Sequence, residues 1–572
     1  MSSPGQDVNE ALSALAARDA EIGGEACDLF GAPPGPGSRY DFPEFQPFTR
    51  FQHEFVPGSS RTRRLRTALG NRLHSRGASA SLGRPRSGRA RVVETGGWVF
   101  FVGAGCTLHA DAARLVAQSP AAGHADLVYG DSVHYGGSDP GQSVHQLRPG
   151  WSPERLKAHC YVGEVLVARP ELVDRAGGAK RLARCSSHDR ALRLAETAEG
   201  VGRVPALLYA SPHDQRMPSA DRAAVAAHCL RTGVEAAVDQ SPDGSHVRVL
   251  RRSPARPSTA VIIPTRGTSV RAGDGERVLA VTAIETLLSK CGADIDEILV
   301  VFDEETPPAA REAILLAGGE KARAVEYRGE FNFARKINIA AVRTESEHLL
   351  FMNDDVEIET PDTIQVLRGY LTDPAIGLVA PILLFEDGTV QSAGHLLNPA
   401  SFDLYRGYPV GTSGGNGMLK VAREASSVIA AVALTRRTDF VDVGGLCEEF
   451  PGDYNDVDYA LKLSMSGKRT VVTPYVQCRH LESKTRRAVP DDDAIARLGA
   501  RWQQIIENDP LGNPGLQRYE FVWKSDVDTE WSLEEAVGRR VRWDREEWDR
   551  LRSSADPRLH RTRYFAHKVL GR

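Results

Sequence analysis

The sequence predicts an α/β protein built from at least two units that follow one another along the chain. Short apolar segments typical of strands alternate with helical segments, first from about Trp98 to Tyr209 and again from about residue 256. At 572 residues the chain is too long for one hydrophobic core, and its 41% hydrophobic and 26% charged residues are typical of a folded protein. We expect a mainly parallel sheet in the first unit and a second sheet whose strands end in polar residues.

Charge and cysteine content narrow the class of protein. The formal net charge of −4 gives no reason to expect a nucleic-acid partner. The eight cysteines are scattered singly, so neither a zinc site nor a disulfide framework is expected. No apolar run approaches the roughly 18 residues that span a bilayer, and the start, MSSPGQDVNE, lacks the features of a secretory signal. We therefore expect a cytoplasmic protein.

The two ends of the chain differ from its middle. Residues 1–60 are expected to form an extended arm, because residues 24–60 are rich in glycine, proline and aromatic residues. Residues 61–97 are strongly basic, and a solvated linker is the simpler interpretation. Contact with phospholipid headgroups, which would hold the protein at the inner face of the membrane, is the alternative. The charged tail 526–572 is predicted to be helical from EWSLEEAVGRRVRWDREEWDRLRS.

The first unit is predicted to span residues 61–240. WVFFVG and ADLVYGD are strand-like, HADAARLVAQS is helical, and a further helix is expected from Ser219 to Thr232. The polar stretch QSPDGSHVRVLRRSPARPS then marks the main domain boundary.

The second unit is predicted to span residues 256–525. Its expected strands include STAVIIPT, EILVVF, ARAVEYR and HLLFM, and its expected helices are 277–289, 308–316 and 333–342. Each strand ends in polar residues, and the carboxyl ends of strands are where open α/β sheets bind their ligands.

Three polar clusters in the second unit carry candidate chemistry. Asn353-Asp354-Asp355 follows the strand HLLFM, Asp456 opens a helix within YNDVDY, and His480 follows the strand TVVTPYVQC. Acidic groups at the end of a buried strand suit Mg²⁺ or Mn²⁺ held together with substrate phosphates. Taken singly, the clusters also fit a solvated turn, a helix cap and a structural histidine.

Taken together, the clusters resemble the inverting family 2 glycosyltransferases with the GT-A fold. The resembling stretches occur in the family's order and cover nearly all of 256–520: AVIIPTRG, FNFARKINIAA, LLFMNDDVEIETPD, GLVAPILLFEDGTVQSAGHLL, SSVIAAVALTRRTDFVDVGGLCEEF, YNDVDYALKLSMSGKRTVVTPYVQCRHLES and NDPLGNPGL. The resemblance implies a Rossmann-like GT-A domain that transfers a sugar from a nucleotide-diphosphate donor, with UDP- or dTDP-sugars favoured, to a hydroxyl group.

The resemblance also assigns roles to residues. Asp355 and His480 would bind the cation together with Asp354, Asn353 or Asp354 would lie near the ribose and phosphates, and Asp456 would be the catalytic base. The nucleotide pocket would be lined by Pro264, Thr265, Arg266, Asp303 and Asn338. Phe302 stands where the family usually has an aspartate that contacts the base, and Asp303 is its expected substitute.

The assigned chemistry is consistent on physical grounds. A bound cation neutralises the growing charge of a diphosphate leaving group. A carboxylate on the opposite side of the sugar accepts the proton of the attacking hydroxyl. Direct attack from that side inverts the anomeric centre. Such a transferase therefore needs one base and one metal.

The first unit resembles the same family in a degenerate form, as in tandem proteins whose first module precedes the catalytic one. The strand that normally carries the acidic motif ends in Gly103-Ala104-Gly105, and Ser187-His188-Asp189 stands at the base motif. We expect no catalysis there, because these side chains at 103–105 cannot bind a cation. Asp189 is expected to cap a helix.

Two other classes of function remain as alternatives. A nucleotidyltransferase would share the α/β sheet and the acidic site, but PTRGTSV lacks a glycine-rich phosphate loop. A scaffold that binds nucleotide sugar or carbohydrate without transfer is the other alternative. Galactofuranosyl, rhamnosyl, glucosyl and N-acetylglucosaminyl transfer all fit, with a glycan, a lipid-linked glycan or a protein as acceptor.

Overall fold

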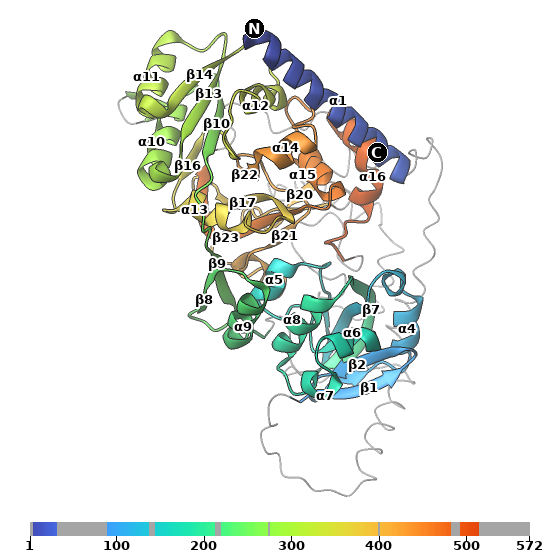
Figure 1. The fold of residues 1–572 in the computed structure, drawn as a ribbon. Helices are drawn as coiled ribbons and strands as arrows, with labels where there is room; N and C mark the ends of the chain where they lie inside the picture. The colour runs from blue at the N-terminus through green and yellow to red at the C-terminus, as the bar shows by residue number, and fades with distance from the viewer. Residues whose placement is uncertain are drawn as a thin grey trace, which may run out of the picture.

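The computed structural model describes residues 4–30, 89–135, 143–211, 219–272, 275–397, 401–481 and 492–513. It contains a seven-stranded sheet in the first unit and a ten-stranded sheet in the second (Figure 1). The basic segment 61–88, most of the proposed arm and the C-terminal tail lie outside the described residues. Within the described residues, no helix is both long and apolar enough to span a bilayer.

The first sheet is mostly antiparallel. Its strand order is β1-β2-β6-β4-β7-β3, with β5 paired to β4, and among these pairs only β4 and β7 run parallel. The prediction of a mainly parallel sheet is therefore wrong, because β6 is inserted between β2 and β4 in the opposite direction. The elements are β1 (Arg91–Thr95), β2 (Trp98–Val102), β3 (Thr107–Leu108), α4 (Ala112–Gln118), η1 (Pro120–Gly123), β4 (Leu127–Tyr135), β5 (Ser143–Gln146), α5 (Pro153–Ala158), β6 (Val165–Ala168), α6 (Pro170–Arg175), α7 (Ala179–Leu182), α8 (Ser187–Thr197), β7 (Val201–Ser211) and α9 (Arg222–Thr232).

The second sheet has the order β14-β13-β10-β15-β22-β17-β23-β16, with β18 on β17 and β21 on β23. Its β14-β13-β10-β15 part is parallel, as the alternation of strands and helices predicts. The elements are β10 (Thr259–Thr265), β11 (Ser269–Ala272), β12 (Gly275–Val278), α10 (Leu279–Cys291), η2 (Gly292–Asp294), β13 (Glu297–Asp303), α11 (Pro308–Gly318), η3 (Gly319–Lys321), β14 (Ala322–Tyr327), α12 (Phe333–Ala341), β15 (His348–Met352), β16 (Val356–Ile358), α13 (Thr363–Tyr370), β17 (Ile376–Leu384), β18 (Val390–Ser392), β19 (His395–Leu397), β20 (Ser401–Asp403), η4 (Gly415–Lys420), β21 (Arg423–Ala425), β22 (Val432–Arg436), α14 (Arg437–Asp442), α15 (Asn455–Met465), β23 (Arg469–His480) and α16 (Asp492–Glu507).

The two sheets repeat one arrangement. The order β2-β6-β4-β7-β3 corresponds to β15-β22-β17-β23-β16, and β5 lies on β4 as β18 lies on β17. Directions agree too, since β4 is parallel to β7 and β17 is parallel to β23. At the strand ends, Val102 pairs with Val165 as Met352 pairs with Val432. Strands β10, β13 and β14 have no counterpart among the described residues of the first unit, where β1 lies beside β2.

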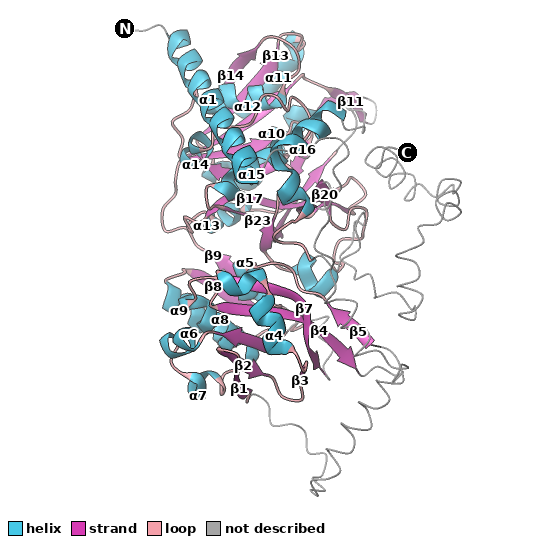
Figure 2. Cartoon of the chain, turned by 90° about the vertical axis from the view of Figure 1, so that its right-hand side faces the viewer, coloured by secondary structure: helices cyan, strands magenta, loops and turns pink. Residues whose placement is uncertain are grey.

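The N-terminal segment contains a helix, α1 (Pro4–Phe30), and not the extended arm expected for residues 1–60. The chain is helical here because apolar residues such as Leu15 and Ile22 recur on one face and are buried against the second unit. Figures 1 and 2 both show α1 lying along α16. Glycine and proline become frequent only beyond this helix, and residues 31–60 lie outside the described part.

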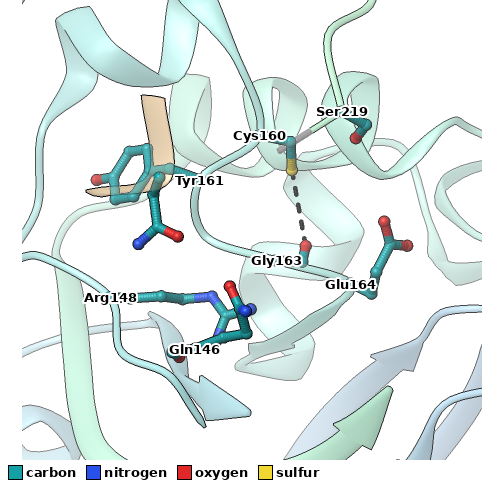
Figure 3. Close-up of a pocket in the computed structure, with 8 residues that line it drawn as sticks. Gln146, Arg148, Cys160, Tyr161, Gly163, Glu164 and Ser219 are labelled. Atoms are coloured by element: carbon teal, nitrogen blue, oxygen red, sulfur yellow. Dashed lines mark hydrogen bonds between the residues drawn. The ribbon is translucent and has the colours of Figure 1, made fainter. Parts of the chain in front are cut away.

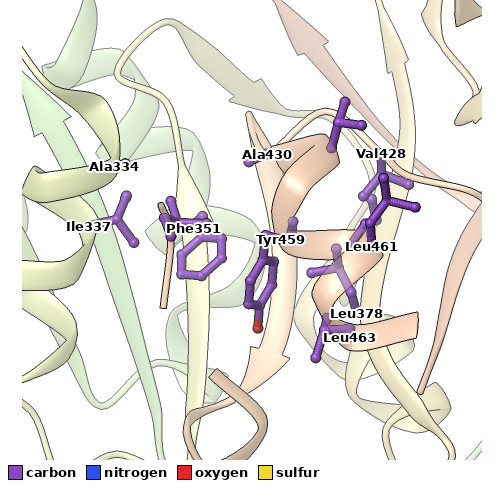
Figure 4. Close-up of a cluster of buried hydrophobic side chains, with 14 of the residues drawn as sticks. Ala334, Ile337, Phe351, Leu378, Val428, Ala430, Tyr459, Leu461 and Leu463 are labelled. Carbon is purple, nitrogen blue, oxygen red and sulfur yellow. The ribbon is translucent and has the colours of Figure 1, made fainter. Parts of the chain in front are cut away.

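The core of the second unit lies on both faces of β15. Phe351 of β15 makes edge-on ring contacts with Phe440 and Tyr459, whose ring centroids lie 5.6 and 6.1 Å away. Figure 4 shows the rings of Phe351 and Tyr459 beside each other. All five residues of β15 are buried. This strand is therefore held firmly, and the polar segment that follows it leaves the sheet from a fixed point.

The two units are joined by buried polar contacts. Ser152 Oγ donates to Glu424 Oε2 at 2.5 Å, and Asn513 Nδ2 donates to both carboxylate oxygens of Asp131 at 3.1 Å. The polar stretch predicted as the boundary forms part of a hairpin, β8 (Ala236–Gln240) and β9 (Val247–Arg251), because VRVL alternates apolar and polar residues. Both views place β9 and α5 where the units meet (Figure 2).

Candidate active site

Strand pairing brings Asp355 and His480 together at one edge of the second sheet. β16 runs antiparallel to β23, with Val356 opposite His480, and the backbone N–H of Leu481 donates to the carbonyl oxygen of Asp355 at 2.9 Å. Nε2 of His480 consequently lies 3.1 Å from Oδ1 of Asp355. The side chains of Asp355 and His480 are 13% and 8% exposed, respectively, so both are largely shielded from water.

The orientation of His480 suits a metal ligand. Its Nδ1 lies 2.8 Å from the side-chain oxygen of Gln391, which can only accept, so Nδ1 carries the proton. The lone pair of Nε2 is then directed toward Asp355, with Nδ2 of Asn353 at 3.3 Å. A metal-binding histidine usually donates its other ring N–H to an acceptor, which holds the ring in the orientation that binding requires. Asp355 and His480 fit a divalent cation whose remaining ligands come from a diphosphate.

Asp354 turns toward the neighbouring strand. Its Oδ2 accepts a 2.6 Å hydrogen bond from Oγ1 of Thr265 at the end of β10. Burial, and after it the nearby carboxylate of Asp355, raises the pKa of Asp354 to about 6. Adjacent carboxylates that are costly to ionise together favour a bound cation, because it would stabilise both in the charged form.

Asp303 ends β13 next to Thr265 and is surrounded by cations. Nε of Arg266 lies 3.0 Å and Nζ of Lys336 lies 2.5 Å from its two oxygens. Phe302 is fully buried in the core below, which is why an aromatic residue is tolerated there. Pro264 lies within β10 opposite a residue of β13 and is also buried.

Asn338 has a different environment from the other candidates for the nucleotide pocket. It is 2% exposed, its Nδ2 donates to the carbonyl oxygen of Leu446, and its Oδ1 accepts from the N–H of Leu446. Nδ2 also reaches the carboxylate of Glu448 at 3.1 Å. The side-chain amide of Asn338 therefore holds the loop after α14 in place, and the structure does not bring it to Asp354 or Asp355.

Asp456 lies in the first turn of α15. Its Oδ2 accepts from the N–H of Ala430 at 3.2 Å, and its Oδ1 from the N–H of Val457 at 2.8 Å. Burial raises the pKa of Asp456, although the positive charge of His395 and the two N–H groups lower it in part. A carboxylate with a raised pKa accepts a proton more readily than an ordinary aspartate, as a general base requires.

Three supporting residues were missed in the sequence. Gln391 orients His480, Lys336 pairs with Asp303, and His395 lies near Asp456 with its Nε2 3.2 Å from Oδ1 of Asp403. Both Gln391 and His395 occur in the resembling stretch GLVAPILLFEDGTVQSAGHLL, and Lys336 in FNFARKINIAA. Their presence was visible, but the partners that give them a role come from distant segments.

The first unit has small residues at the matching place. The N–H of Gly103 donates to the carbonyl oxygen of Glu164 at 2.9 Å, as the N–H of Asn353 donates to that of Ala431 at 2.9 Å. The Gly-Ala-Gly segment 103–105 therefore stands where the acidic segment 353–355 stands. Its side chains offer no ligand to a cation.

The register also locates the counterpart of His480. Thr107 pairs with Ala210 in the first sheet as Glu357 pairs with Arg479 in the second. The next residue along β7 is Ser211, which therefore occupies the position of His480. Both candidate metal positions of the second unit are thus filled by residues without a strong ligand.

Asp189 corresponds to Asp458 and not to Asp456. DRALRL, which begins at Asp189, matches DYALKL, which begins at Asp458, and each stands equally far before the strand pairs that the two sheets share. Ser187 therefore stands at the place of Asp456. The helix cap is Ser186, whose Oγ accepts from the N–H of Asp189, so the expectation that Asp189 caps α8 is wrong.

A small cavity lies in the first unit beside the residues that correspond to Ala430 and Ala431. Gly163 and Glu164 line it together with Arg148, Tyr161 and four other residues, and its volume is about 10 Å³ (Figure 3). A cavity of this size holds about one water molecule.

A third group of potential ligands lies beneath α1. Ligand atoms of Asp19, Cys447 and Asp458 lie within 4.8 Å of one another. Nζ of Lys462, however, is 2.5 Å from Asp19 and 3.6 Å from Asp458, and Arg501 reaches both carboxylates. The negative charge is already neutralised by these cations, so the group is an ion-pair network.

No model of a known protein family matches the sequence. The chain is 30% identical over 399 residues to the O-antigen biosynthesis protein RfbC of Myxococcus xanthus, a match covering 66% of this chain and 30% of that protein. It is 26% identical over 408 residues to the uncharacterized protein y4gI of Sinorhizobium fredii, a match covering 66% of this chain and 44% of that protein. The chain thus spans less than half the length of these curated relatives.

Two solved structures show a distant similarity. GalNAc-T7 with UDP, GalNAc and Mn²⁺ has a TM-score of 0.33 and 10% identity, covering 45% of this chain and 50% of that chain. The mannosyltransferase PcManGT from Pyrobaculum calidifontis, in complex with GDP-Man and Mn²⁺, has a TM-score of 0.33 and 16% identity, covering 55% of this chain and 87% of that chain.

Proposed function

We propose that the second unit is an inverting glycosyltransferase that moves a sugar from a nucleotide-diphosphate donor to an acceptor hydroxyl. The observation that carries the proposal is the meeting of Asp355 and His480 at the strand edge that also holds Asp354 and Thr265. A Mn²⁺ or Mg²⁺ ion held there would supply positive charge to the leaving diphosphate. The name of the Myxococcus relative supports a role in making a polysaccharide.

Each proposed residue has one task. Asp355 and His480 bind the cation, and Thr265, Arg266 and Asp303 bind the nucleotide at the ends of β10 and β13. Asp456 accepts the proton of the acceptor hydroxyl as its oxygen bonds to the anomeric carbon. The bond from that carbon to the diphosphate breaks at the same time, and its electron pair leaves with the diphosphate. The anomeric configuration is inverted because attack and departure occur on opposite sides.

The first unit is proposed to be a degenerate, non-catalytic relative of the second. The repeated strand order and register support a common arrangement. Glycine and alanine at 103–105, and Ser211 in the place of His480, support the loss of a metal site. We propose that this unit, packed on the second through contacts such as that of Ser152 with Glu424, helps to shape the acceptor side.

A panel of donors tests the proposed activity. The full chain is incubated with UDP-, dTDP- and GDP-sugars and Mn²⁺, and donor cleavage and glycosylated products are followed by mass spectrometry. We expect cleavage of one donor class that stops on chelation and returns with Mn²⁺. Saturable, metal-dependent binding without cleavage or transfer in the presence of glycan, lipid-linked glycan and protein acceptors would instead establish a nucleotide-sugar-binding scaffold.

A further inference from the structure

Helix α1 fills a groove on the second unit. At Gly444, whose φ is +78°, an added Cβ would lie 2.3 Å from the backbone nitrogen of Asp19, so α1 passes directly over this glycine. The carboxylate of Asp19 reaches Nζ of Lys462 at 2.5 Å, and it also lies near Cys447 and Asp458. The groove thus accepts a helix at close range and binds its acidic side chain with a buried cation.

The first unit contains the same framework. Gly177 and Gly178 follow α6 with φ of +101° and +86°, as Gly444 and Gly445 follow α14 with φ of +78° and +67°. The N–H groups of Gly178 and Gly445 each donate to the carbonyl oxygen of the fifth residue back, at 2.9 and 2.8 Å. The glycine pairs are therefore equivalent, and the cleft beside Gly177 corresponds to the groove that α1 fills.

Four residues of the second unit that surround Asp19 or α1 have counterparts in the first unit that line this cleft. Gly444, Cys447, Asp458 and Lys462 correspond to Gly177, Lys180, Asp189 and Arg193, by the glycine pairs and by the register of the sheets. All four counterparts line one open cleft of about 770 Å³. Its lining is completed by Arg181, Arg184, Cys185, Ser186, Asp221, Ala223, Ala224 and Ala227. The groove that α1 occupies in the second unit therefore has an equivalent in the first unit, and no described residue fills it.

The cleft is more cationic than its counterpart. Lys180 stands where the second unit has Cys447, and Arg181 and Arg184 add two further charges. These three side chains are exposed, and Arg193 pairs with Asp189 at 3.0 Å. A carboxylate that lay in this cleft as Asp19 lies in the groove of the second unit would face both Lys180 and Arg193.

The opposite wall of the cleft is lined by small side chains. It is formed by α9, which presents Ala223, Ala224 and Ala227. Small side chains on one face let a second helix approach closely. Helix α1, which fills the equivalent groove, carries six acidic residues and one arginine. Shape and charge together therefore match an acidic helix.

We propose that the cleft lined by Gly177, Lys180, Arg184 and α9 is a docking site for an acidic α-helix of a partner protein. The helix lies across Gly177 as α1 lies across Gly444, and a carboxylate of its buried face meets Lys180 and Arg193. Helix α1 already occupies the groove of the second unit, and no described segment of the chain is seated in the cleft, so we assign the helix to another polypeptide. This site is independent of the proposed sugar transfer.

A labelled synthetic peptide of residues 4–30 serves as the probe, and its binding to the full chain is measured by fluorescence anisotropy. We expect one peptide per chain, with affinity that falls as salt is added. The pair Lys180→Glu and Arg184→Glu should weaken binding by about tenfold or more, because it replaces attraction with repulsion. The pair Arg114→Glu and Lys290→Glu makes the same change in charge at exposed sites outside the cleft, and it should leave binding unchanged.

Two further variants test shape and register. Ala223→Trp adds no charge but fills the cleft from an exposed position on α9, so it should also weaken binding. A peptide with Asp19→Asn should bind more weakly than the parent peptide. Circular dichroism of each chain variant confirms that it is folded.

Three outcomes would overturn the proposal. The first is absence of peptide binding or binding unaffected by the cleft variants. The second is equal binding of inorganic polyphosphate together with indifference to Ala223→Trp, which would make the cleft a general anion site. The third is a dimer in sedimentation that is lost in the Lys180→Glu and Arg184→Glu variant, which would make a second copy the occupant.

Discussion

Nε2 of His480 lies 3.1 Å from Oδ1 of Asp355, although the two residues enter the second sheet on strands far apart in the sequence. Their meeting depends on the antiparallel pairing of β16 with β23. The same pairing in the first unit joins a glycine-containing segment to Ser211. One backbone arrangement thus carries candidate metal ligands in one unit and none at the matching positions of the other.

Substitution of the proposed metal ligands should remove turnover. We expect Asp355→Ala and His480→Ala each to lower kcat about 100-fold or more, because the leaving diphosphate loses its cation. Gln391→Ala should lower kcat about tenfold and weaken the apparent affinity for Mn²⁺, since it frees the imidazole of His480 to turn. Metal titrations of donor cleavage check this order, and full activity in folded Asp355→Ala would remove the metal assignment.

Asp456→Asn should separate binding from transfer. The amide keeps the size of the side chain, but it cannot accept the proton of the acceptor. We expect the Kd for the nucleotide-sugar, measured by calorimetry, to change little while transfer falls by about 100-fold or more. Undiminished transfer would leave Asp456 as a structural residue of α15.

The rate should fall on the acid side at a pH above the ordinary range of an aspartate. Burial raises the pKa of Asp456, and the base is lost as pH falls through that raised value. The positive charge of His395 opposes this shift. His395→Gln should therefore raise the pKa of Asp456 and move the acid limb of the pH–rate profile to higher pH. Movement of the limb to lower pH would contradict this assignment.

Variants in the first unit should not affect transfer. Ser187→Ala changes the counterpart of Asp456, and Asp189→Ala changes the counterpart of Asp458. We expect both variants to keep wild-type kcat and donor affinity, because no cation ligands stand at residues 103–105 of that unit. Loss of turnover in a variant shown to be folded by circular dichroism would indicate a second active site.

The ion pair beneath α1 should contribute to stability. Asp19→Ala leaves Lys462, which is 0% exposed, with Asp458 as its more distant acidic partner. We expect a loss of about 3 kcal/mol in the free energy of unfolding, as for a broken buried pair. Glu21→Ala, which removes an exposed pair with Arg18 on the same helix, should cost less than about 1 kcal/mol. Urea denaturation of both variants measures the difference.

Hydrophobic periodicity and the residues at element ends were sufficient to predict most helices and strands of the second unit. The predicted helices 308–316 and 333–342 agree with α11 and α12 to within two residues, and HLLFM is β15. Local patterns suffice here because a buried strand or an amphipathic helix shows its period within a few residues. The acidic segment after β15 and the helix start at Asp456 were likewise visible as local motifs.

The tertiary structure alone decided the direction of strands and the partners of side chains. The mostly antiparallel first sheet and the helix α1 in place of an arm depend on contacts between distant segments. The register of the two sheets, in turn, places Ser187 at the position that corresponds to Asp456. The role of Gln391 depends on β18 and β23 lying on either side of β17. Sequence patterns report which face of an element is apolar, whereas the choice of a neighbour depends on how all elements bury their surfaces together.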